Sequence, residues 1–272
     1  MKEKNAKVSV IMGVYNCADT LEKAIESIFA QTYADWELII CDDGSKDNSY
    51  EIAKKYAKMY PDKVKLICHT ENLYLSATLN DCLKIATGHY IARMDADDMS
   101  MPHRFEQQIE FLQNNPQFQL VGSAMQLFNE TGDANILRRE EFPDKYSLRN
   151  GTPFSHPTIM TYKYVYDTLN GYTVSERTRF GQDYDLWFRF YAKGYVGANI
   201  QTPLYRFKED INAIKRRTFK SRIDSYKTIL FGYKLLGYPL MWYIKPTLAL
   251  LKGFVPSRVV FVYRKLQALK KG

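Results

Sequence analysis

Cysteine is scarce in this sequence and never closely spaced. The 272 residues include four cysteines, and no two of them form a CxxC pattern. Scattered cysteines argue against a zinc site and against a disulfide framework, and they suit a reducing compartment. A hydrophobic core must therefore hold the fold, and 46% hydrophobic with 25% charged residues is an ordinary composition for such a core.

Long hydrophobic runs are also missing. The first apolar run, "VSVIM" at 8–12, is too short and too β-branched for a signal peptide, and no small-residue cleavage site follows it. We expect this run to form the first strand. Towards the other end, the longest uncharged run is Leu235–Ile244. It falls short of the roughly 18 residues that a membrane-spanning helix needs.

The common phosphate-binding loops are absent. The sequence contains neither GxGxxG nor GxxxxGK followed by Ser or Thr. A nucleotide bound by this chain would therefore be held neither by a dinucleotide-binding fingerprint nor by a P-loop.

Basic charge is concentrated in the last 58 residues. Residues 215–272 hold fourteen Lys and Arg against one acid, Asp224, and so carry +13. The rest of the chain holds 24 basic and 29 acidic residues and carries −5. A basic segment of this kind is typical of contact with nucleic acid or with an anionic membrane surface.

Four apolar runs, at 8–12, 36–41, 64–68 and 89–94, predict strands. Amphipathic helical patterns fill the gaps between them, and the first of these helices is predicted to begin at a capping box of Asp19 and Glu22. Near-continuous apolar strands that alternate with helices indicate a parallel, doubly wound α/β sheet.

Further elements are predicted after Pro102. A helix is followed by a strand at 118–128, by an irregular stretch at 129–157 and by a short strand at 158–162. A last helix is expected within 180–194, with Gly194 at its carboxyl end.

Three polar clusters follow predicted strands, at 13–16, 42–49 and 95–98. Ligands bind at the carboxyl ends of the strands in sheets of this class, so we expect the clusters to line one edge. Asp43 can make the turn after its strand or accept a hydrogen bond from a nucleobase. Tyr15 can be a packed aromatic residue or can stack on a base.

The cluster Asp95, Asp97 and Asp98 can hold a hard cation. Mg²⁺ prefers oxygen ligands, and it commonly combines one or two carboxylates with substrate phosphates. The alternative is a solvated acidic turn in which Asp98 or Ser100 caps the next helix. The position at a strand end, beside a second acidic cluster, favours the cation.

Three stretches together resemble a known family. They are "VSVIMGVYNCADTLEKAIESIFAQTYADWELIICDDGSKDNS", "GHYIARMDADDMSMPHRF" and "GYTVSERTRFGQDYDLWFR". The chain resembles glycosyltransferase family 2, whose members are inverting, nucleotide-sugar-dependent enzymes with the GT-A fold. The likeness runs in order over roughly residues 7–210.

The resemblance implies roles for the donor residues. Tyr15 and Asp43 would contact the nucleobase, and Gly13 belongs to the same donor motif. Asp95 would lie near the ribose and diphosphate. Asp97, with Asp98, would hold a divalent metal, Mn²⁺ or Mg²⁺.

The resemblance also implies roles beyond the donor. Asp183 would be the general base. His156, in "FSHPTIMTYK", resembles a stretch common in capsule and exopolysaccharide members, and it would contact donor or acceptor. The alternative for His156 is a structural hydrogen bond.

The sequence departs from the family pattern at two positions. Gln182 stands where the family usually has Glu before the base, although it remains a candidate for contact with acceptor or donor. Tyr74 stands where the family often has Gly, so the loop near the donor is expected to differ. The Gln-x-x-Arg-Trp motif of processive members is absent, which favours addition of a single sugar.

We therefore expect a GT-A catalytic domain at 1–212 and a basic, aromatic-rich helical tail at 213–272. Tyr, Trp and flanking basic residues suit a tail that lies in the bilayer interface, on the cytoplasmic face where lipid-linked acceptors occur. The alternatives for the tail are a helical lid on the catalytic domain and a dimer contact, and oligomer formation is left open. Nucleic acid is not an expected partner, because the aromatic residues lie within aliphatic runs.

The expected reaction transfers a sugar from a UDP-sugar or similar donor to a hydroxyl of a glycan or of a lipid-linked acceptor, in cell-surface polysaccharide synthesis. Two other readings are a nucleotidyltransferase, which also uses paired acids on an α/β sheet, and a catalytically inactive family member. The intact Asp95, Asp97 and Asp183 argue against the inactive protein.

Overall fold

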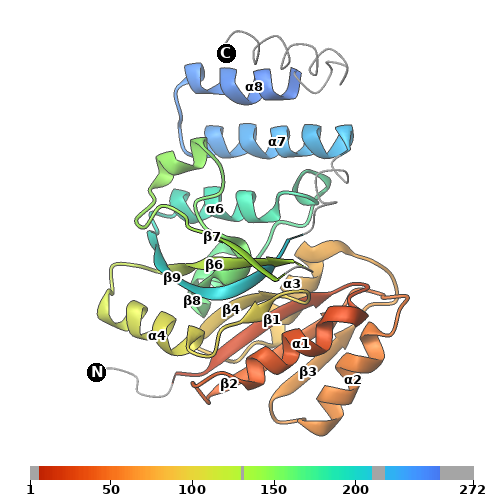
Figure 1. The fold of residues 1–272 in the computed structure, drawn as a ribbon. Helices are drawn as coiled ribbons and strands as arrows, with labels where there is room; N and C mark the ends of the chain where they lie inside the picture. The colour runs from red at the N-terminus through yellow and green to blue at the C-terminus, as the bar shows by residue number, and fades with distance from the viewer. Residues whose placement is uncertain (1–5, 130–131, 210–217, 252–272) are drawn as a thin grey trace, which may run out of the picture.

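The computed structural model describes residues 6–129, 132–209 and 218–251. Within them the chain forms a mixed α/β fold with one nine-stranded sheet (Figure 1). The strands are β1 Val8–Val14, β2 Trp36–Asp42, β3 Val64–Cys68, β4 Tyr90–Asp95, β5 Met99–Ser100, β6 Leu120–Asn129, β7 Gly132–Leu137, β8 Met160–Tyr162 and β9 Gly197–Lys208. The α-helices are α1 Ala18–Phe29, α2 Ser49–Met59, α3 Tyr74–Ile85, α4 Arg104–Asn114, α5 Lys163–Leu169, α6 Gln182–Ala192, α7 Phe219–Leu235 and α8 Ile244–Leu251. Short 3₁₀ helices lie at η1 Lys145–Arg149, η2 His156–Thr158, η3 Glu176–Thr178 and η4 Leu240–Tyr243.

The sheet has a parallel part and a mixed part. Its order is β3-β2-β1-β4-β8-β6-β9-β5, with β7 paired to β6. The four strands β3, β2, β1 and β4 are parallel, as the sequence predicts. Beyond β4, the short strand β8 runs antiparallel to both β4 and β6, and β6 pairs in parallel with β9.

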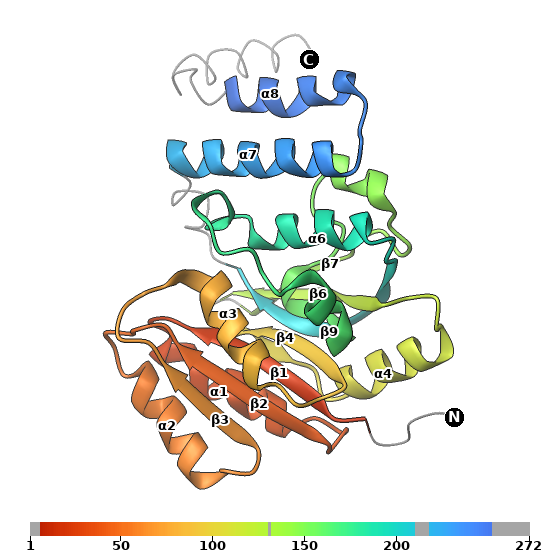
Figure 2. The same cartoon turned by 180° about the vertical axis from the view of Figure 1, so that it is seen from behind.

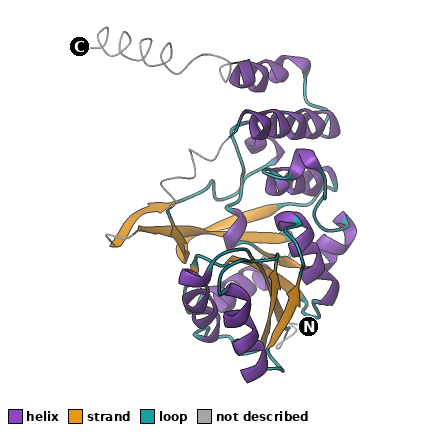
Figure 3. Cartoon of the chain, turned by 90° about the vertical axis from the view of Figure 1, so that its right-hand side faces the viewer, coloured by secondary structure: helices purple, strands orange, loops and turns teal. Residues whose placement is uncertain are grey.

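Helices cover both faces of the sheet. One core lies beneath α1, α2 and α4, and it includes Met12, Ile40 and Met94 of the central strands. The other lies beneath α3, α5 and α6, and it includes Ile11, Ile39 and Ile91 (Figure 2). Successive strand residues thus alternate between two buried layers, which explains why the strands are apolar throughout. In the side view of Figure 3, helices lie on both sides of the strands.

The predicted strands and principal helices are confirmed, but the capping box is wrong. The N-cap of α1 is Cys17, and its side chain makes no capping hydrogen bond. Instead, the Ala18 amide donates to Asp47 at 3.0 Å, and the Cys17 amide donates to Ser49 Oγ at 2.8 Å. Side chains from the start of α2 therefore cap α1.

The helices after β9 form layers over α6. Figure 1 shows α7 above α6, and α8 above α7. The approach of α7 is close at Gly232, where an added Cβ would lie 2.1 Å from the Phe188 ring of α6. Thr228 of α7 donates to the Arg177 carbonyl at 2.7 Å. The described part of the tail thus packs on the segment that carries Asp183, which is the lid arrangement named above. No helix among the described residues combines the length and the apolar character needed to cross a membrane.

Candidate active site

Sheet register brings the three polar clusters to one edge. Val14 pairs with Asp42, and Gly13 pairs with Asp95, so β1, β2 and β4 end side by side. This convergence was predicted from the sequence. Gly13 lets α3 approach β1 closely: a Cβ there would lie 2.8 Å from Leu75 Cδ1 and 3.1 Å from Thr78 Cγ2, so the Leu75 side chain would have to move. Tyr15, just beyond β1, is 45% exposed and its ring is available to a ligand.

Asp95, Asp97 and Asp98 form a compact acidic group. Each offers an oxygen within 4.8 Å of the others. Asp98 is buried, and it uses one carboxylate oxygen to accept the Lys208 amide at 2.7 Å. Its other oxygen is also buried and has no hydrogen-bond partner in the described structure. Burial and the neighbouring Asp95 and Asp97 charges raise the pKa of Asp98 to about 8.

Asp97 is exposed at the mouth of this group. The pKa of its carboxyl is raised, mainly through desolvation by the surrounding protein and to a smaller extent by the Asp95 charge. Carboxylate oxygens of this kind suit a hard divalent cation. The unpartnered oxygen of Asp98 and the exposed carboxylate of Asp97 therefore fit the metal that the acidic pattern implies, and Asp95 is engaged elsewhere.

Asp95 is paired with a buried cation that the sequence analysis did not single out. Arg93 contacts Asp95 through Nη1 and is only 3% exposed. The two residues are separated by one position on β4, so they share a face of the sheet. The charged Arg inside an apolar strand was the available signal. The Asp95 amide also donates to Tyr205 Oη at 3.1 Å, which ties the strand end to β9.

Asp183 lies in the first turn of α6 and is half-buried. Burial raises the pKa of its carboxyl, and this outweighs the opposing effects of the Tyr184 amide at 2.8 Å and of the Arg93 and Arg139 charges. Asp95 and Asp183 therefore respond to the same buried arginine, although they come from distant parts of the chain. A half-buried carboxyl with a raised pKa is suited to accept a proton.

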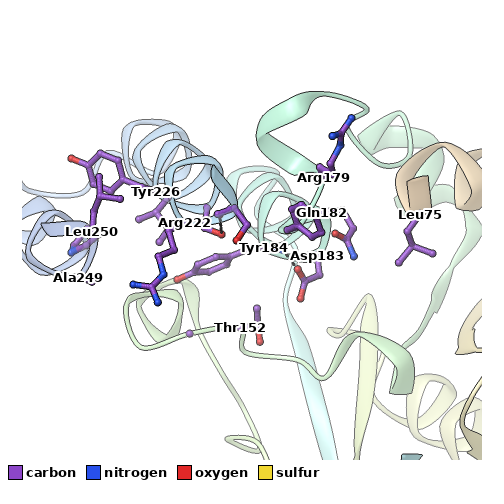
Figure 4. Close-up of a pocket in the computed structure, with 16 residues that line it drawn as sticks. Leu75, Thr152, Arg179, Gln182, Asp183, Tyr184, Arg222, Tyr226, Ala249 and Leu250 are labelled. Atoms are coloured by element: carbon purple, nitrogen blue, oxygen red, sulfur yellow. Dashed lines mark hydrogen bonds between the residues drawn. The ribbon is translucent and has the colours of Figure 1, made fainter. Parts of the chain in front are cut away.

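A cavity of about 960 Å³ extends from Asp183 to the last two helices. Gln182, Leu75 and Arg179 line it near Asp183, and Tyr226, Ile229, Ala249 and Leu250 line it along α7 and α8. Figure 4 shows Leu75 and Leu250 at opposite sides of the view, with Asp183 and Tyr184 between them. Asp97 and Asp98 line a separate cavity of about 250 Å³ together with Lys23 and Lys208. The acids and the base thus line two separate cavities, and the charge of Arg93 acts on both Asp95 and Asp183.

Asp43 is buried and accepts several hydrogen bonds from the protein. The amides of Leu73 and Tyr74 donate to its two carboxylate oxygens, each at 2.9 Å. His69 Nδ1 lies 2.8 Å from Asp43, and its Nε2 lies 2.9 Å from Asp81. Asp43 thus fixes the start of α3 at the polar edge. Contact with a nucleobase stays a prediction for this residue.

His156 lies in a buried layer behind the site. Its Nε2 is 2.8 Å from Tyr172 Oη, which is 2.7 Å from Tyr166 Oη. Burial and then the Arg93 charge hold the pKa of His156 well below its usual value, so the imidazole is neutral. The hydrogen bond to Tyr172 matches the structural alternative named for this residue, and its contact with substrate stays a prediction.

Comparison with known proteins agrees with the fold. Residues 9–168 match the model of the family described as glycosyl transferase family 2. EpsE of Bacillus subtilis (strain 168), a protein named as a glycosyltransferase, is 44% identical over 97% of this chain and 95% of its own length. WfaP of Escherichia coli, named as a UDP-Glc:alpha-D-GlcNAc-diphosphoundecaprenol beta-1,3-glucosyltransferase, is 27% identical over 79% of this chain and 82% of its own. The crystal structure of S. aureus TarS 1-349 in complex with UDP-GlcNAc superposes with a TM-score of 0.70 at 17% identity, covering 90% of this chain and 70% of the TarS 1-349 chain.

The fold is thus that of the GT-A transferases, and the chain belongs to glycosyltransferase family 2. It is a glycosyltransferase, which decides between the two enzyme classes that the acidic clusters left open. The family match ends at residue 168, before Asp183 and the helices that line the large cavity.

The His69 contacts predict a pH-dependent stability. Burial alone would lower the pKa of His69, but the Asp43 and Asp81 carboxylates raise it above 6.5. Because the pKa of His69 is higher in the folded than in the unfolded protein, protonated His69 stabilises the fold. This stabilisation is fully present below the pKa of the unfolded state and is lost as pH rises through the pKa of the folded state. The melting temperature of the wild type, measured from about pH 6 to about pH 9, should fall relative to that of His69→Gln. The exposed His103 gives the matched control His103→Gln, which should follow the wild type, and parallel curves for wild type and His69→Gln would contradict the assignment.

Proposed function

We propose that this protein transfers one sugar from a nucleotide-diphosphate sugar to the hydroxyl of a glycan or lipid-linked acceptor, with inversion, in the synthesis of a cell-surface polysaccharide. The observation that carries this proposal is the position of Asp183, a half-buried carboxyl at one end of a large cavity, within the electrostatic influence of the same buried arginine that pairs with Asp95. The name of the relative WfaP supports a UDP-sugar as donor and a lipid diphosphate as acceptor.

Asp183 acts as the general base in this proposal. Its carboxylate takes the proton of the acceptor hydroxyl as the oxygen attacks the anomeric carbon. The new bond forms on one face of the sugar while the bond to the diphosphate breaks on the other, and the electron pair leaves with the nucleoside diphosphate. Base and leaving group on opposite faces produce inversion, as in inverting glycosidases.

The acidic group supports the departing diphosphate. Asp97 and Asp98 would hold the divalent metal, Mn²⁺ or Mg²⁺, and when bound it would supply positive charge to neutralise the diphosphate. Arg93 keeps Asp95 oriented at the end of β4 beside them. Tyr15 and Asp43 lie on the neighbouring strand ends, where the nucleoside would be held.

The lipid-linked acceptor is supported by the large cavity and the surface beside it. The cavity is polar at Asp183 and Gln182, its α7 wall mixes Arg222 and Tyr226 with Ile229, and its α8 wall is apolar at Ala249 and Leu250. Four apolar side chains of η4 and α8 are largely exposed, and we call them the apolar rim. They are Leu240 (84% exposed), Met241 (69%), Ile244 (59%) and Leu248 (52%). Exposed apolar side chains beside basic charge suit a bilayer interface. We therefore propose that the 213–272 segment binds the cytoplasmic face of the membrane and receives the acceptor there.

Asp183→Asn should abolish transfer while retaining donor binding. Loss of a general base lowers the rate by about 10²–10⁴-fold. Because the pKa of Asp183 is raised, wild-type kcat should fall with decreasing pH earlier than for an ordinary aspartate, as the carboxylate is protonated. The contrasting variant is Asp185→Asn, which disrupts a buried pair with Arg177 and Arg189 and should lower the melting temperature. Undiminished transfer by Asp183→Asn would exclude this residue as the base.

Asp97→Ala should remove metal-dependent donor binding. Titration of UDP-sugars with and without Mn²⁺ measures this, and the loss is expected to equal the metal-dependent part of the wild-type affinity. Asp62→Ala, at an exposed acid between α2 and β3, serves as the control for lost charge. Donor affinity that is insensitive both to Mn²⁺ and to Asp97→Ala would rule out the metal role.

Leu240→Glu with Met241→Glu should release the protein from vesicles that contain phosphatidylglycerol. The two charges replace apolar side chains that would lie in the interface, whereas Met59→Glu places one such charge on the exposed face of α2 and should leave binding intact. Co-sedimentation measures both. These substitutions are preferable to truncation after about Asn212, which would uncover the α6 face beneath Gly232. Equal sedimentation of all three proteins would exclude the apolar rim as the membrane contact.

A further inference from the structure

Tyr74 has a backbone conformation that tyrosine seldom adopts. Its φ is +69°, and the other non-glycine residues with positive φ in the described ranges are both asparagines, Asn16 and Asn170. Asparagine tolerates the left-handed region because its short polar side chain bonds locally, whereas a bulky residue there is strained. A glycine would adopt this φ freely. The Tyr74 backbone is therefore strained, and residues with strained backbones occur preferentially at functional sites.

The polar edge of the site holds Tyr74 in this conformation. Its amide donates to Asp43 at 2.9 Å and to Asn72 Oδ1 at 3.0 Å, and its carbonyl accepts from Thr78 Oγ1 at 3.0 Å. Asp43 is itself buried and is held by His69. The backbone of Tyr74 is thus fixed to the end of β2, and only its ring extends outward.

The ring of Tyr74 contacts the segment that precedes the base. The Arg179 guanidinium lies 3.8 Å from the ring centroid, at the carboxyl end of η3 and four residues before Asp183. A cation over an aromatic face is attracted by the ring quadrupole. This pair therefore joins the donor half of the molecule, through α3, to the half that carries the base.

The pair lies at one end of the large cavity. Leu75, which follows Tyr74, lines the cavity together with Arg179 and Asp183 (Figure 4). Leu75 is also the side chain that packs against Gly13 of β1. Leu75 therefore lies between the strand end beside the donor and the cavity wall beside the base.

We propose that Tyr74 and Arg179 form a clasp that positions the segment 173–181, and with it Asp183, against the donor half of the site. The two are positioning residues for the transfer reaction, at the cavity end that Leu75 and Arg179 line. This proposal rests on the proposed function for its kinetic consequence, but the clasp itself is a contact that can be tested without turnover.

The first test is amide hydrogen exchange of residues 173–181, with no substrate present. Tyr74→Gly removes the ring and leaves a backbone that glycine adopts freely, so the variant should fold with an unchanged or raised melting temperature. We expect faster exchange in Tyr74→Gly and in Arg179→Met, and wild-type exchange in Tyr74→Phe, which retains the ring. Lys63→Met removes a cation 4.1 Å from the Trp36 ring at the opposite end of β2 and should change nothing in 173–181. Unchanged exchange in the first two variants, or faster exchange in Tyr74→Phe, would overturn the clasp.

The second test is kinetic. Tyr74→Gly should lower kcat for transfer by up to about a hundredfold, as expected for a misplaced base. It should also raise the ratio of donor hydrolysis to transfer and leave the donor KM nearly unchanged. Because both residues act through one contact, the double variant with Arg179→Met should be no worse than the poorer single variant. Additive losses, or wild-type transfer and hydrolysis by Tyr74→Gly, would overturn the positioning role. If the wild type turned over no nucleotide sugar, the proposed function would fail, and hydrogen exchange would still decide the clasp.

Discussion

The pairing of Arg93 with Asp95 is the interaction on which the site depends. A buried cation is costly unless it is paired, and three neighbouring carboxylates repel one another. Arg93 offsets part of that repulsion, and its own pKa is raised by the Asp95 charge even though burial opposes this. The same guanidinium partly opposes the rise that burial causes in the pKa of Asp183, and it adds to burial in lowering the pKa of His156. A single side chain on β4 thus acts electrostatically on groups from three separate segments.

The pattern of apolar residues along the sequence predicted the strands and helices whose side chains face the two hydrophobic cores. β1, β2 and β4 are apolar throughout because both of their faces are covered, and their shared direction brings the acidic clusters together. β7 lies within the stretch predicted to be irregular. Its residues are almost all exposed, so no alternation reveals it. The sequence pattern did not predict β9, because this strand includes Pro203. The pairing of β9 with β6 also shifts register near Ala124.

Contacts between distant segments could not be predicted from spacing. The capping of α1 depends on Asp47, about thirty residues away, and this contact replaced the local pair that the pattern favoured. His69 has no motif around it, and its place between Asp43 and Asp81 follows from how β3 and α3 meet. The family resemblance pointed to Tyr74 as unusual, but only the backbone angle and the Arg179 contact give that departure a physical meaning.

The docking of α7 against α6 at Gly232 has a consequence for how relatives of this chain can diverge. The acids and strand ends assigned to the donor all precede residue 100, whereas the base and the walls of the large cavity come mostly from residues after 150. Under the proposed function, the residues before 100 bind the nucleotide that leaves with the diphosphate. The residues after 150 bind the molecule that receives the sugar. Substitutions along α7 and α8 can therefore change which acceptor is bound, while the leaving group and the reaction stay the same. New products could then arise within one lineage without a new reaction.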